Sequence, residues 1–435
     1  MKIRVLLPLL AAVLLPAVSR AQSLVDAHRD SVASHAMYFE MGGSRYTPQQ
    51  VDSINKIIAQ YYYDQFRGFQ DPEAPYFMFM SKDAQLAMGI GGCVRMRGWY
   101  DIGNVIPANG FAPYLIPMSP QAGGDKRLGS TPAGTALFFR VLGRNKMLGH
   151  YQVYIEGNFN GYEHVGFRLK KAYAVVRDFT IGYAASTFGD PAALSPVIDA
   201  QGANNKISNT AVLLRYMRSV GKGWTVAASV EAPSPQIGAD GTTTATVNSV
   251  CPDGAAFVQY AWGPSSHVRL SGTVRSLGYR DISADKIHRT AGWGVLLSGT
   301  GHPVEPLTLY ATLNYGRGTS SLGGDLLCGA YDLIDNSDSP GHMYAPASLG
   351  YNVGVQYNFR HNLFVSASFS QSRLYADHPV AGSEYKYGLW AAANLFWNLT
   401  PRIQAGVEFD WGLRCNYDGY ARSSRRIGAM CQFSF

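Results

Sequence analysis

Hydrophobic and polar positions alternate with a period of two along most of the chain after residue 85. In Tyr151–Phe159, Leu349–Arg360 and Ile403–Arg414, apolar side chains recur at every second position, with many amide and charged residues between them. Successive side chains of a strand point to opposite faces, so this pattern predicts strands with one apolar face. We count 16 such segments: 85–101, 134–144, 149–159, 164–177, 178–187, 209–219, 222–232, 253–263, 265–280, 287–301, 304–318, 346–360, 362–376, 384–399, 401–415 and 422–435.

The connections between these segments alternate in length. The tight ones fall at 145–148, 177–178, 220–221, 264, 302–303, 361 and 400, and the long ones at 102–133, 188–208, 233–252 and 319–345. An even number of strands, with short turns on one rim and long loops on the other, is typical of an outer-membrane barrel. Alternation alone would also suit a soluble sandwich, but a sandwich has no reason to sort its loops in this way. We therefore predict an all-β protein, a transmembrane 16-stranded antiparallel β-barrel.

Aromatic residues and the end of the chain agree with this interpretation. Aromatic side chains favour the headgroup level of a membrane, so they form girdles near the strand ends. Those expected in the girdles are Tyr100, Tyr151, Phe159, Tyr216, Trp224, Trp262, Trp293, Tyr315, Tyr351, Tyr385, Trp397 and Phe435. An alternating last strand that ends in Phe435 resembles the signal that the barrel-assembly machinery recognises, and we expect that machinery and outer-membrane lipid as partners.

The chain before the barrel has a different character. Lys2 and Arg4 precede the apolar run Val5–Val18, and Ser19-Arg20-Ala21 offers small residues around a cleavage site, so residues 1–21 resemble a signal peptide. Residues 22–84 form an N-terminal extension with one amphipathic helix at about 47–65, begun by Thr47, Pro48 and Gln50 in a capping box. This helix is expected to be a plug in the lumen, a periplasmic assembly element or a lid at the lower rim. Residues 85–435 are the barrel domain.

Composition narrows the class further. Charged residues are 15% and aromatic residues 12% of the 435 residues, which excludes a disordered chain and a coiled coil. The apolar run 5–18 is too short for a spanning helix. Three of the 37 basic residues and no acidic residue lie in 1–21, so the remainder carries a net charge of +4. This small charge does not indicate a nucleic-acid partner.

Five cysteines do not make a disulfide framework in a chain of this length. Cys251 and Cys328 fall in outer loops, where they either pair or stay free, while Cys93, Cys415 and Cys431 are interpreted as small wall residues.

Several strings resemble the DcaP-like outer-membrane porins over most of residues 85–435. They are Phe167–Tyr173, Ile181–Pro191, Gly292–Gly294, Leu297–Gly299, Tyr315–Gly318, Ala393–Trp397, Val407–Phe409 and Arg425–Ile427. The resemblance implies a homotrimer of 16-stranded barrels in the bacterial outer membrane that admits small, preferentially anionic solutes.

The alternation also assigns the charged residues of the wall, independently of any family. The bases expected to face the lumen are Arg95, Arg97, Arg140, Arg168, Lys170, Arg215, Arg269, Arg275, Arg360 and Arg414. The expected acids are Glu156, Glu231, Glu408 and Asp410. An excess of bases on a low-dielectric wall attracts anions. The alternative is a structural network of ion pairs that stiffens the barrel. Lys171 falls on the lipid side, which requires either a bulge or burial between subunits.

The third outer loop, 188–208, is expected to fold inward and narrow the pore, rather than cap a subunit junction. Its polar candidates are Asp190, Asp199, Asn204, Asn205 and Lys206.

No catalytic motif accompanies these features: His-Glu-x-x-His, Gly-x-Ser-x-Gly and Cys-x-x-Cys are all missing from the sequence, and the 10 His residues are scattered. We therefore expect a passive channel for small polar or anionic solutes, not an enzyme, without cofactor or metal. The alternatives are a substrate-specific transporter for phosphate or an organic acid, a barrel enzyme, and a structural barrel closed by the helix at 47–65.

Overall fold

The computed structural model describes residues 37–40, 66–72, 77–80, 86–119, 125–145, 147–160, 166–263 and 265–435. The expected signal peptide at 1–21 and the expected helix at 47–65 lie outside these residues. No helix in the described part of the chain is long and apolar enough to cross a membrane.

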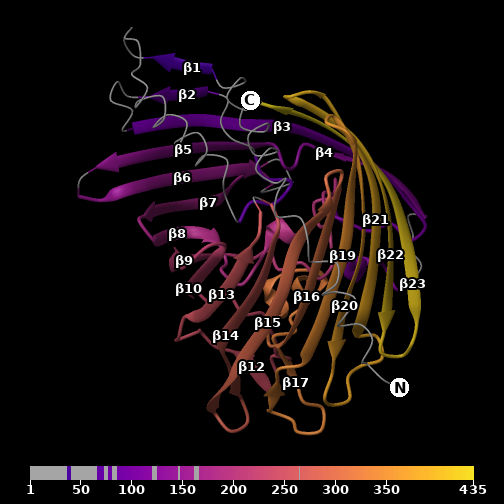
Figure 1. Cartoon of the computed structure of the whole chain (residues 1–435). Coiled ribbons are helices and arrows are strands. Elements are labelled where there is room, and N and C mark those ends of the chain that lie inside the picture. The colour runs from indigo at the N-terminus through magenta and orange to yellow at the C-terminus, as the bar shows by residue number, and fades with distance from the viewer. Residues whose placement is uncertain are drawn as a thin grey trace.

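The chain forms a closed antiparallel barrel of 16 strands, as the alternation predicted (Figure 1). The strands of the barrel are β3 (Leu86–Ile102), β5 (Ala136–Asn145), β6 (Gly149–Phe159), β7 (Phe167–Val176), β8 (Phe179–Ala185), β9 (Thr210–Ser219), β10 (Trp224–Glu231), β13 (Asp253–Ala261), β14 (His267–Asp281), β15 (Lys286–Val304), β16 (Leu307–Arg317), β19 (Ala347–Arg360), β20 (Leu363–Tyr375), β21 (Tyr385–Thr400), β22 (Ile403–Asn416) and β23 (Ala421–Ser434). Closure leaves no sheet edge in the membrane, where an unpaired backbone group would be costly.

The last strand closes the barrel on the first. β23 pairs with β3 from Arg425↔Ile102 to Ser434↔Cys93, and Phe435 exchanges two backbone hydrogen bonds with Gly92. Beyond this point β2 (Phe77–Met80) pairs with β3 in the place of β23, and β1 (Met37–Glu40) lies parallel to β2.

The two faces of the wall differ as a period of two requires. In β22, Val407 and Phe409 are 52% and 44% exposed on the outside, whereas Glu408 and Asp410 are buried on the inside. The outward apolar face suits hydrocarbon, and the inward polar face needs partners within the lumen.

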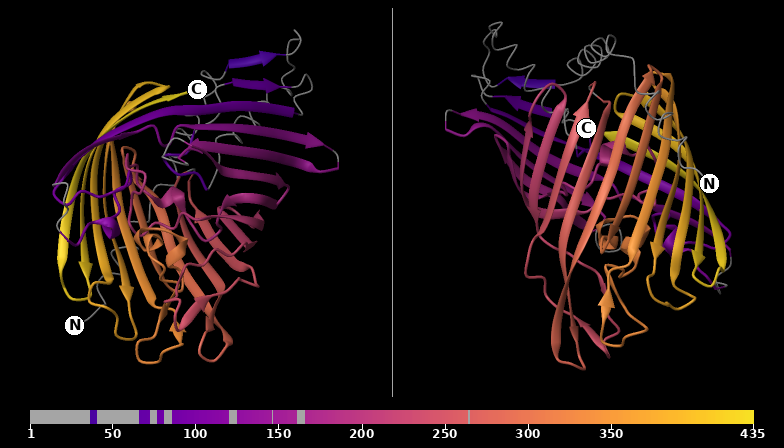
Figure 2. Two further views of the ribbon diagram at one scale, coloured as in Figure 1. Left: turned by 180° about the vertical axis from the view of Figure 1, so that it is seen from behind. Right: turned by 60° about the horizontal axis from the view of Figure 1, so that its bottom comes forward.

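Short turns gather on one rim and long connections on the other. The loops that carry β12 (Thr244–Thr246) and β17 (Leu333–Asp335) hang below the barrel in Figure 1, away from the rim where the C-terminus lies. β17 pairs with β11 (Ile237–Gly238) and with β18 (Met343–Tyr344), so the fourth and sixth outer loops form a small sheet of their own. The link between β3 and β5 contains β4 (Lys126–Thr131), which continues the wall along the outer half of β3. Figure 2 shows that some of the segments that connect the strands lie inside the barrel.

Among the register shifts along the described wall, those near Lys170 and Tyr385 change the direction in which predicted residues point. The pairing of β6 with β7 passes from Glu156↔Lys171 to Gly157↔Leu169, so Lys170 is the extra residue. Lys170 and Lys171 both bond to partners within the lumen, and the lipid-facing position that alternation gives Lys171 is wrong.

The second bulge lies at the outer end of β21. The register with β22 shifts between Tyr385 and Tyr387. Tyr385 is consequently fully buried and donates a hydrogen bond to Asp325. The prediction that Tyr385 belongs to the aromatic girdle is wrong for this reason.

The cysteines form no disulfide. Cys251 and Cys328 are exposed and free, so the pairing considered for them is not made. Cys93 and Cys415 are buried in the wall, and Cys431 is exposed.

Candidate functional site: the constricted lumen

The third outer loop, between β8 and β9, lies inside the barrel. At its start, Asp190 accepts hydrogen bonds from Ser298 Oγ (2.6 Å) and lies 2.8 Å from His267 Nε2. Farther along, the backbone N–H groups of Ile198 and Asp199 each donate to the carboxylate of Glu408, both at 2.7 Å. The loop therefore crosses from the wall of β14 and β15 to the wall of β22.

Two asparagines fix the returning half of this loop. The side-chain amide of Asn204 donates to Gly388 O (2.9 Å), and its backbone N–H donates to Ser370 Oγ (3.1 Å). The side-chain amide of Asn205 donates to Thr312 Oγ1 at 3.0 Å. These contacts hold the loop against the inner face of β16, β20 and β21.

Other outer loops brace the third one. Phe111, from the link between β3 and β5, donates its backbone N–H to Asp199 Oδ1 at 2.8 Å. Asp325, from the sixth loop, accepts a hydrogen bond from the Asn204 amide at 3.2 Å. Burial raises the pKa of Asp325 to about 7, although its hydrogen bonds from Tyr385 and Asn204 work in the opposite direction.

A segment from before the barrel also lies in the lumen. We call residues 66–72 the strap. The guanidinium carbon of Arg215 lies 3.9 Å from the centre of the Phe66 ring. Phe69 packs against Phe396, with the two ring centres 5.1 Å apart. The strap thus touches the wall at β9 and, elsewhere, at β21.

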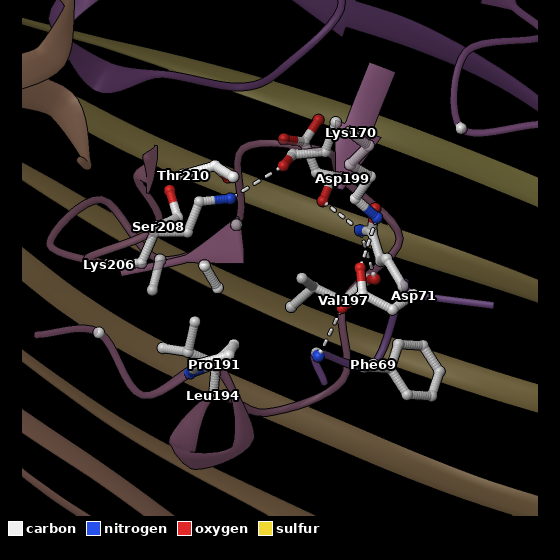
Figure 3. Close-up of a pocket in the computed structure, with 18 of the residues that line it drawn as sticks. Phe69, Asp71, Lys170, Pro191, Leu194, Val197, Asp199, Lys206, Ser208 and Thr210 are labelled. Atoms are coloured by element: carbon white, nitrogen blue, oxygen red, sulfur yellow. Dashed lines mark hydrogen bonds and ion pairs between the residues drawn. The ribbon is translucent and has the colours of Figure 1, made fainter. Parts of the chain in front are cut away.

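The end of the strap carries its polar contacts (Figure 3). The Gln70 amide donates to Asp199 O at 2.7 Å and to Val197 O at 3.1 Å. Asp71 is bound by both Lys170 and Lys171, the second at 3.0 Å. Burial acts to raise the pKa of Asp71, but the positive charges of the two lysines outweigh burial, so the pKa of Asp71 lies well below its usual range.

The strap and the third loop together enclose a cavity of about 300 Å³. It is lined by the strap residues Phe66 and Gly68–Asp71, by much of 185–210, and by inward residues of the wall. The charged side chains on its lining are Asp71, Arg95, Arg97, Lys170, Lys171, Asp199 and Lys206. Five bases and two acids therefore line this cavity.

These bases differ in how they are satisfied. Arg95 donates to Gln432 and to the backbone oxygen of Gln70. Arg97 donates to Ile198 O at 3.3 Å, and Lys206 donates to Ala200 O at 3.0 Å. Among the residues that the structure describes, Arg97 and Lys206 have no carboxylate within ion-pair distance. Burial lowers the pKa of Lys206 to about 8.

Four of the other expected lumen bases, Arg140, Arg215, Arg269 and Arg275, are buried inside the barrel but do not line this cavity. Arg140 lies 4.7 Å above the ring of Tyr154, and Arg269 donates to Gln259 and to Gly189 O. Arg275 binds Asp253 (2.9 Å) and Asp332 (3.1 Å) with a fully buried side chain. The contacts of Arg275 therefore fit a structural network of ion pairs better than a role in anion selectivity.

Three further bases lie toward the rims. Arg414 donates to Tyr114 O and to Asn416. Arg168 and Arg360 are exposed. Arg168 is paired in register with Asn158, a residue of the cavity lining.

The predicted acids all accept hydrogen bonds inside the barrel. Glu156 binds Lys170 Nζ at 2.8 Å, and Glu231 accepts from Thr187 N at 2.8 Å. Asp410 accepts from Trp390 Nε1 at 3.2 Å. Glu231 and Glu408 thus fasten the two halves of the third loop, a role that the sequence did not suggest.

Within the described residues, one group of carboxylates is close enough to consider for a metal: oxygens of Asp199, Glu408 and Asp410 lie within 4.8 Å of one another. Glu408 and Asp199 already accept backbone N–H groups, and the Arg426 guanidinium lies 3.5 Å from Asp199. These carboxylates therefore hold the third loop in place.

A chain of Thr300, His267 and Asp190 has the order of a hydrolytic triad. All three residues are buried and none lines the cavity. Ser298 donates to Asp190 and has no bond to the imidazole that would activate it. The geometry is that of a loop anchor.

Sequence reasoning missed the strap. Phe66, Phe69, Gln70 and Asp71 lie in a stretch without periodicity, and only the unexplained Lys171 signalled that a buried anion was needed near β7.

No family model matches the sequence, and no curated protein is significantly similar to it. Solved structures are similar. The outer membrane channel DcaP of Acinetobacter baumannii has a TM-score of 0.69 at 19% identity, covering 82% of this chain and 99% of that chain. The anion-selective porin from Comamonas acidovorans has a TM-score of 0.52 at 12% identity, covering 81% of this chain and 100% of that chain. The trimer form of OmpT from Vibrio cholerae has a TM-score of 0.50 at 9% identity, covering 81% of this chain and 100% of that chain. The chain therefore has the fold of outer-membrane channels, and the resemblance to DcaP-like porins is confirmed at the level of the fold.

Proposed function

We propose that the protein is an outer-membrane porin for passive diffusion of small polar solutes, with a preference for anions. The observation that carries this proposal is the cavity between the strap and the third loop, where five bases face two acids. A cationic constriction with low-dielectric walls concentrates anions and repels cations. The Comamonas acidovorans protein that shares this fold is an anion-selective porin, which supports the same conclusion.

The constriction residues have separate parts in this function. Arg95, Arg97, Lys170 and Lys206 supply the positive field, and Asp190, Asn204 and Asn205 fix the loop that narrows the path. Arginine suits carboxylate, phosphate and sulfonate groups because its planar fork donates two parallel hydrogen bonds. The buried bases Arg269 and Arg275 brace the loops.

The assembly is part of the proposal. We infer a homotrimer, because the fold is shared with a protein solved in a trimer form. We also infer insertion by the barrel-assembly machinery, because β23, the strand that closes the barrel, alternates between apolar and polar residues. Lys171 gives no support to the trimer, because the bulge at Lys170 places its charge inside the barrel and not on the lipid face.

The test is the reversal potential of the purified protein in a planar bilayer under a salt gradient. A potential of the anion-selective sign, with conductance steps in groups of three, is the expected result. A cation-selective potential would show that the bases at the constriction do not set the field. Saturable block by inorganic phosphate would favour the second candidate, a phosphate or organic-acid transporter, which the grouping of Arg95, Lys170 and Lys171 around one cavity supports.

A further inference from the structure

The strap crosses the path that the proposed function requires. Phe66 lies against Arg215 and Phe257, Phe69 against Phe364 and Phe396, and Asp71 against the lysines of β7. These contacts belong to different parts of the wall, so seven residues reach across the lumen at the level of the third loop.

Side chains hold the strap in place. Its backbone closes a turn on itself, with Asp71 N–H donating to Gly68 O at 3.1 Å and Gly68 N–H donating to Asp71 Oδ2 at 3.0 Å. Gln70 ties it to three carbonyl groups of the third loop, at Val197, Ile198 and Asp199. A segment attached in this way leaves without breaking any strand of the barrel.

We propose that the strap is a built-in gate, and that the Asp71 carboxylate occupies the place on Lys170 and Lys171 that an anion takes when the gate opens. This inference rests on the proposed channel function. Asp71 pairs with two of the five bases on the cavity, with its Oδ2 3.0 Å from Lys171 Nζ, and together with Glu156 it balances their charge. Glu156 remains as the one acid beside the pair, bound to Lys170 at 2.8 Å. Departure of Asp71 leaves two ammonium groups facing one carboxylate, and this excess of positive charge attracts an anion.

Phe66 has a related part. Its ring covers Arg215 at 3.9 Å, and Arg269 lies 5.4 Å from the same ring. The face of an aromatic ring attracts a guanidinium, so Phe66 shields two inward bases while the strap is seated. Opening the strap therefore uncovers the guanidinium groups of Arg215 and Arg269 toward the lumen, and the same movement widens the path.

A disulfide provides a direct test. A Cβ atom built on Gly68 lies 3.7 Å from Cβ of Pro191 in the third loop, a separation that suits a disulfide. The variant Gly68→Cys/Pro191→Cys, in a Cys251→Ser/Cys328→Ser background, is compared oxidised and reduced in planar bilayers. We expect conductance at least about threefold lower in the oxidised form, restored by reduction. The Gly68→Cys single variant in the same background is the matched control and should not respond.

Each other outcome overturns a stated part of the inference. Equal conductance in both redox states, with the cross-linked peptide confirmed by mass spectrometry, would show that the strap does not gate the channel, while the porin proposal stands. Failure of the disulfide to form in a folded barrel would overturn the position of the strap. Silence of every variant and of the parent protein would overturn the channel function itself, and the gate with it.

The charge of Asp71 is tested separately. Asp71→Asn should raise the anion-over-cation permeability ratio in potassium chloride by about threefold, because the lysine pair becomes available. Asp285→Asn, an exposed acid in an outer loop, is the control. Asp71→Glu should stay close to the parent. If Asp71→Asn shifts the permeability ratio no more than Asp285→Asn does, the carboxylate does not compete with permeating anions.

Discussion

Lys171 Nζ lies 3.0 Å from Asp71 Oδ2, across 100 residues of sequence. The contact joins a strand of the barrel wall to a segment from before the barrel, and it exists because the bulge at Lys170 turns two consecutive lysines into the lumen. One extra residue in β7 therefore decides whether a charge faces lipid or binds the strap.

The first prediction concerns Lys171. If it pointed to lipid, Lys171→Leu would stabilise the barrel, because a lysine at the membrane midplane is costly. We expect the opposite: removing one partner of a largely buried ion pair should destabilise the protein by about 2 kcal/mol, with Lys170 still holding Asp71. The measurement is the urea midpoint of the barrel in detergent. Val175→Leu, a change between apolar residues of the same strand, serves as the control.

The wall of the barrel was predictable from the sequence because its rule is local. A period of two depends only on neighbouring residues, so the strands and the two faces of β22 follow from alternation. The bulge in β7 was one of the two explanations that the charge of Lys171 allowed, and the structure confirms it. The bulge at Tyr385 was not predictable, since an extra residue there breaks alternation without a sequence signal of its own. Lys171 was the visible sign of the bulge in β7, because alternation placed its charge on the lipid face.

The constriction was predictable only in part, for a similar reason. The position of residues 188–208 as the third outer loop, and their polar content, indicated that they lie in the lumen. The anchors of this loop on Glu408, Ser370 and Thr312 come from strands far along the chain. The strap depends on the fit of Phe66 and Asp71 to separate parts of the wall, which no local pattern encodes.

The second prediction separates bracing from selectivity. Arg275 is fully buried between Asp253 and Asp332 and also donates to Gly318 O. Arg275→Ala leaves two carboxylates without their cation and should cost about 3 kcal/mol of stability. Unfolding by urea measures the loss. An unchanged urea midpoint together with altered ion selectivity would contradict the bracing role and place Arg275 in the solute path.

The third prediction uses Asp325, whose pKa is raised to about 7 in the folded protein. A carboxyl group titrates near 3.9 in the unfolded chain, so the folded state binds the proton more tightly. This contribution to stability is present at low pH and is lost as pH rises from about 4 to about 7. Asp325→Asn should therefore be more stable than the parent at pH 8, by a few kcal/mol, and nearly equal to it at pH 4.

Urea midpoints at the two pH values measure this difference. Asp338→Asn, an outer-loop acid that is largely exposed, is the comparison. Equal destabilisation by Asp325→Asn at both pH values would show that Asp325 stays ionised and that its hydrogen bonds from Tyr385 and Asn204 outweigh the burial.

The last prediction concerns the pH dependence of permeation. Lys206 faces the cavity with a pKa lowered to about 8, so its positive charge is present at neutral pH and is lost as pH rises through 8. Arg97 on the same lining stays charged, because a guanidinium does not lose its proton in this range. Anion selectivity should therefore fall between pH 7 and pH 9 without disappearing. In Lys206→Met the selectivity should start lower and stay flat over this range, whereas in Arg97→Gln it should start lower and still fall. Reversal potentials at the two pH values decide the matter, and a parent channel whose selectivity does not change with pH would show that Lys206 does not act on the permeating ions.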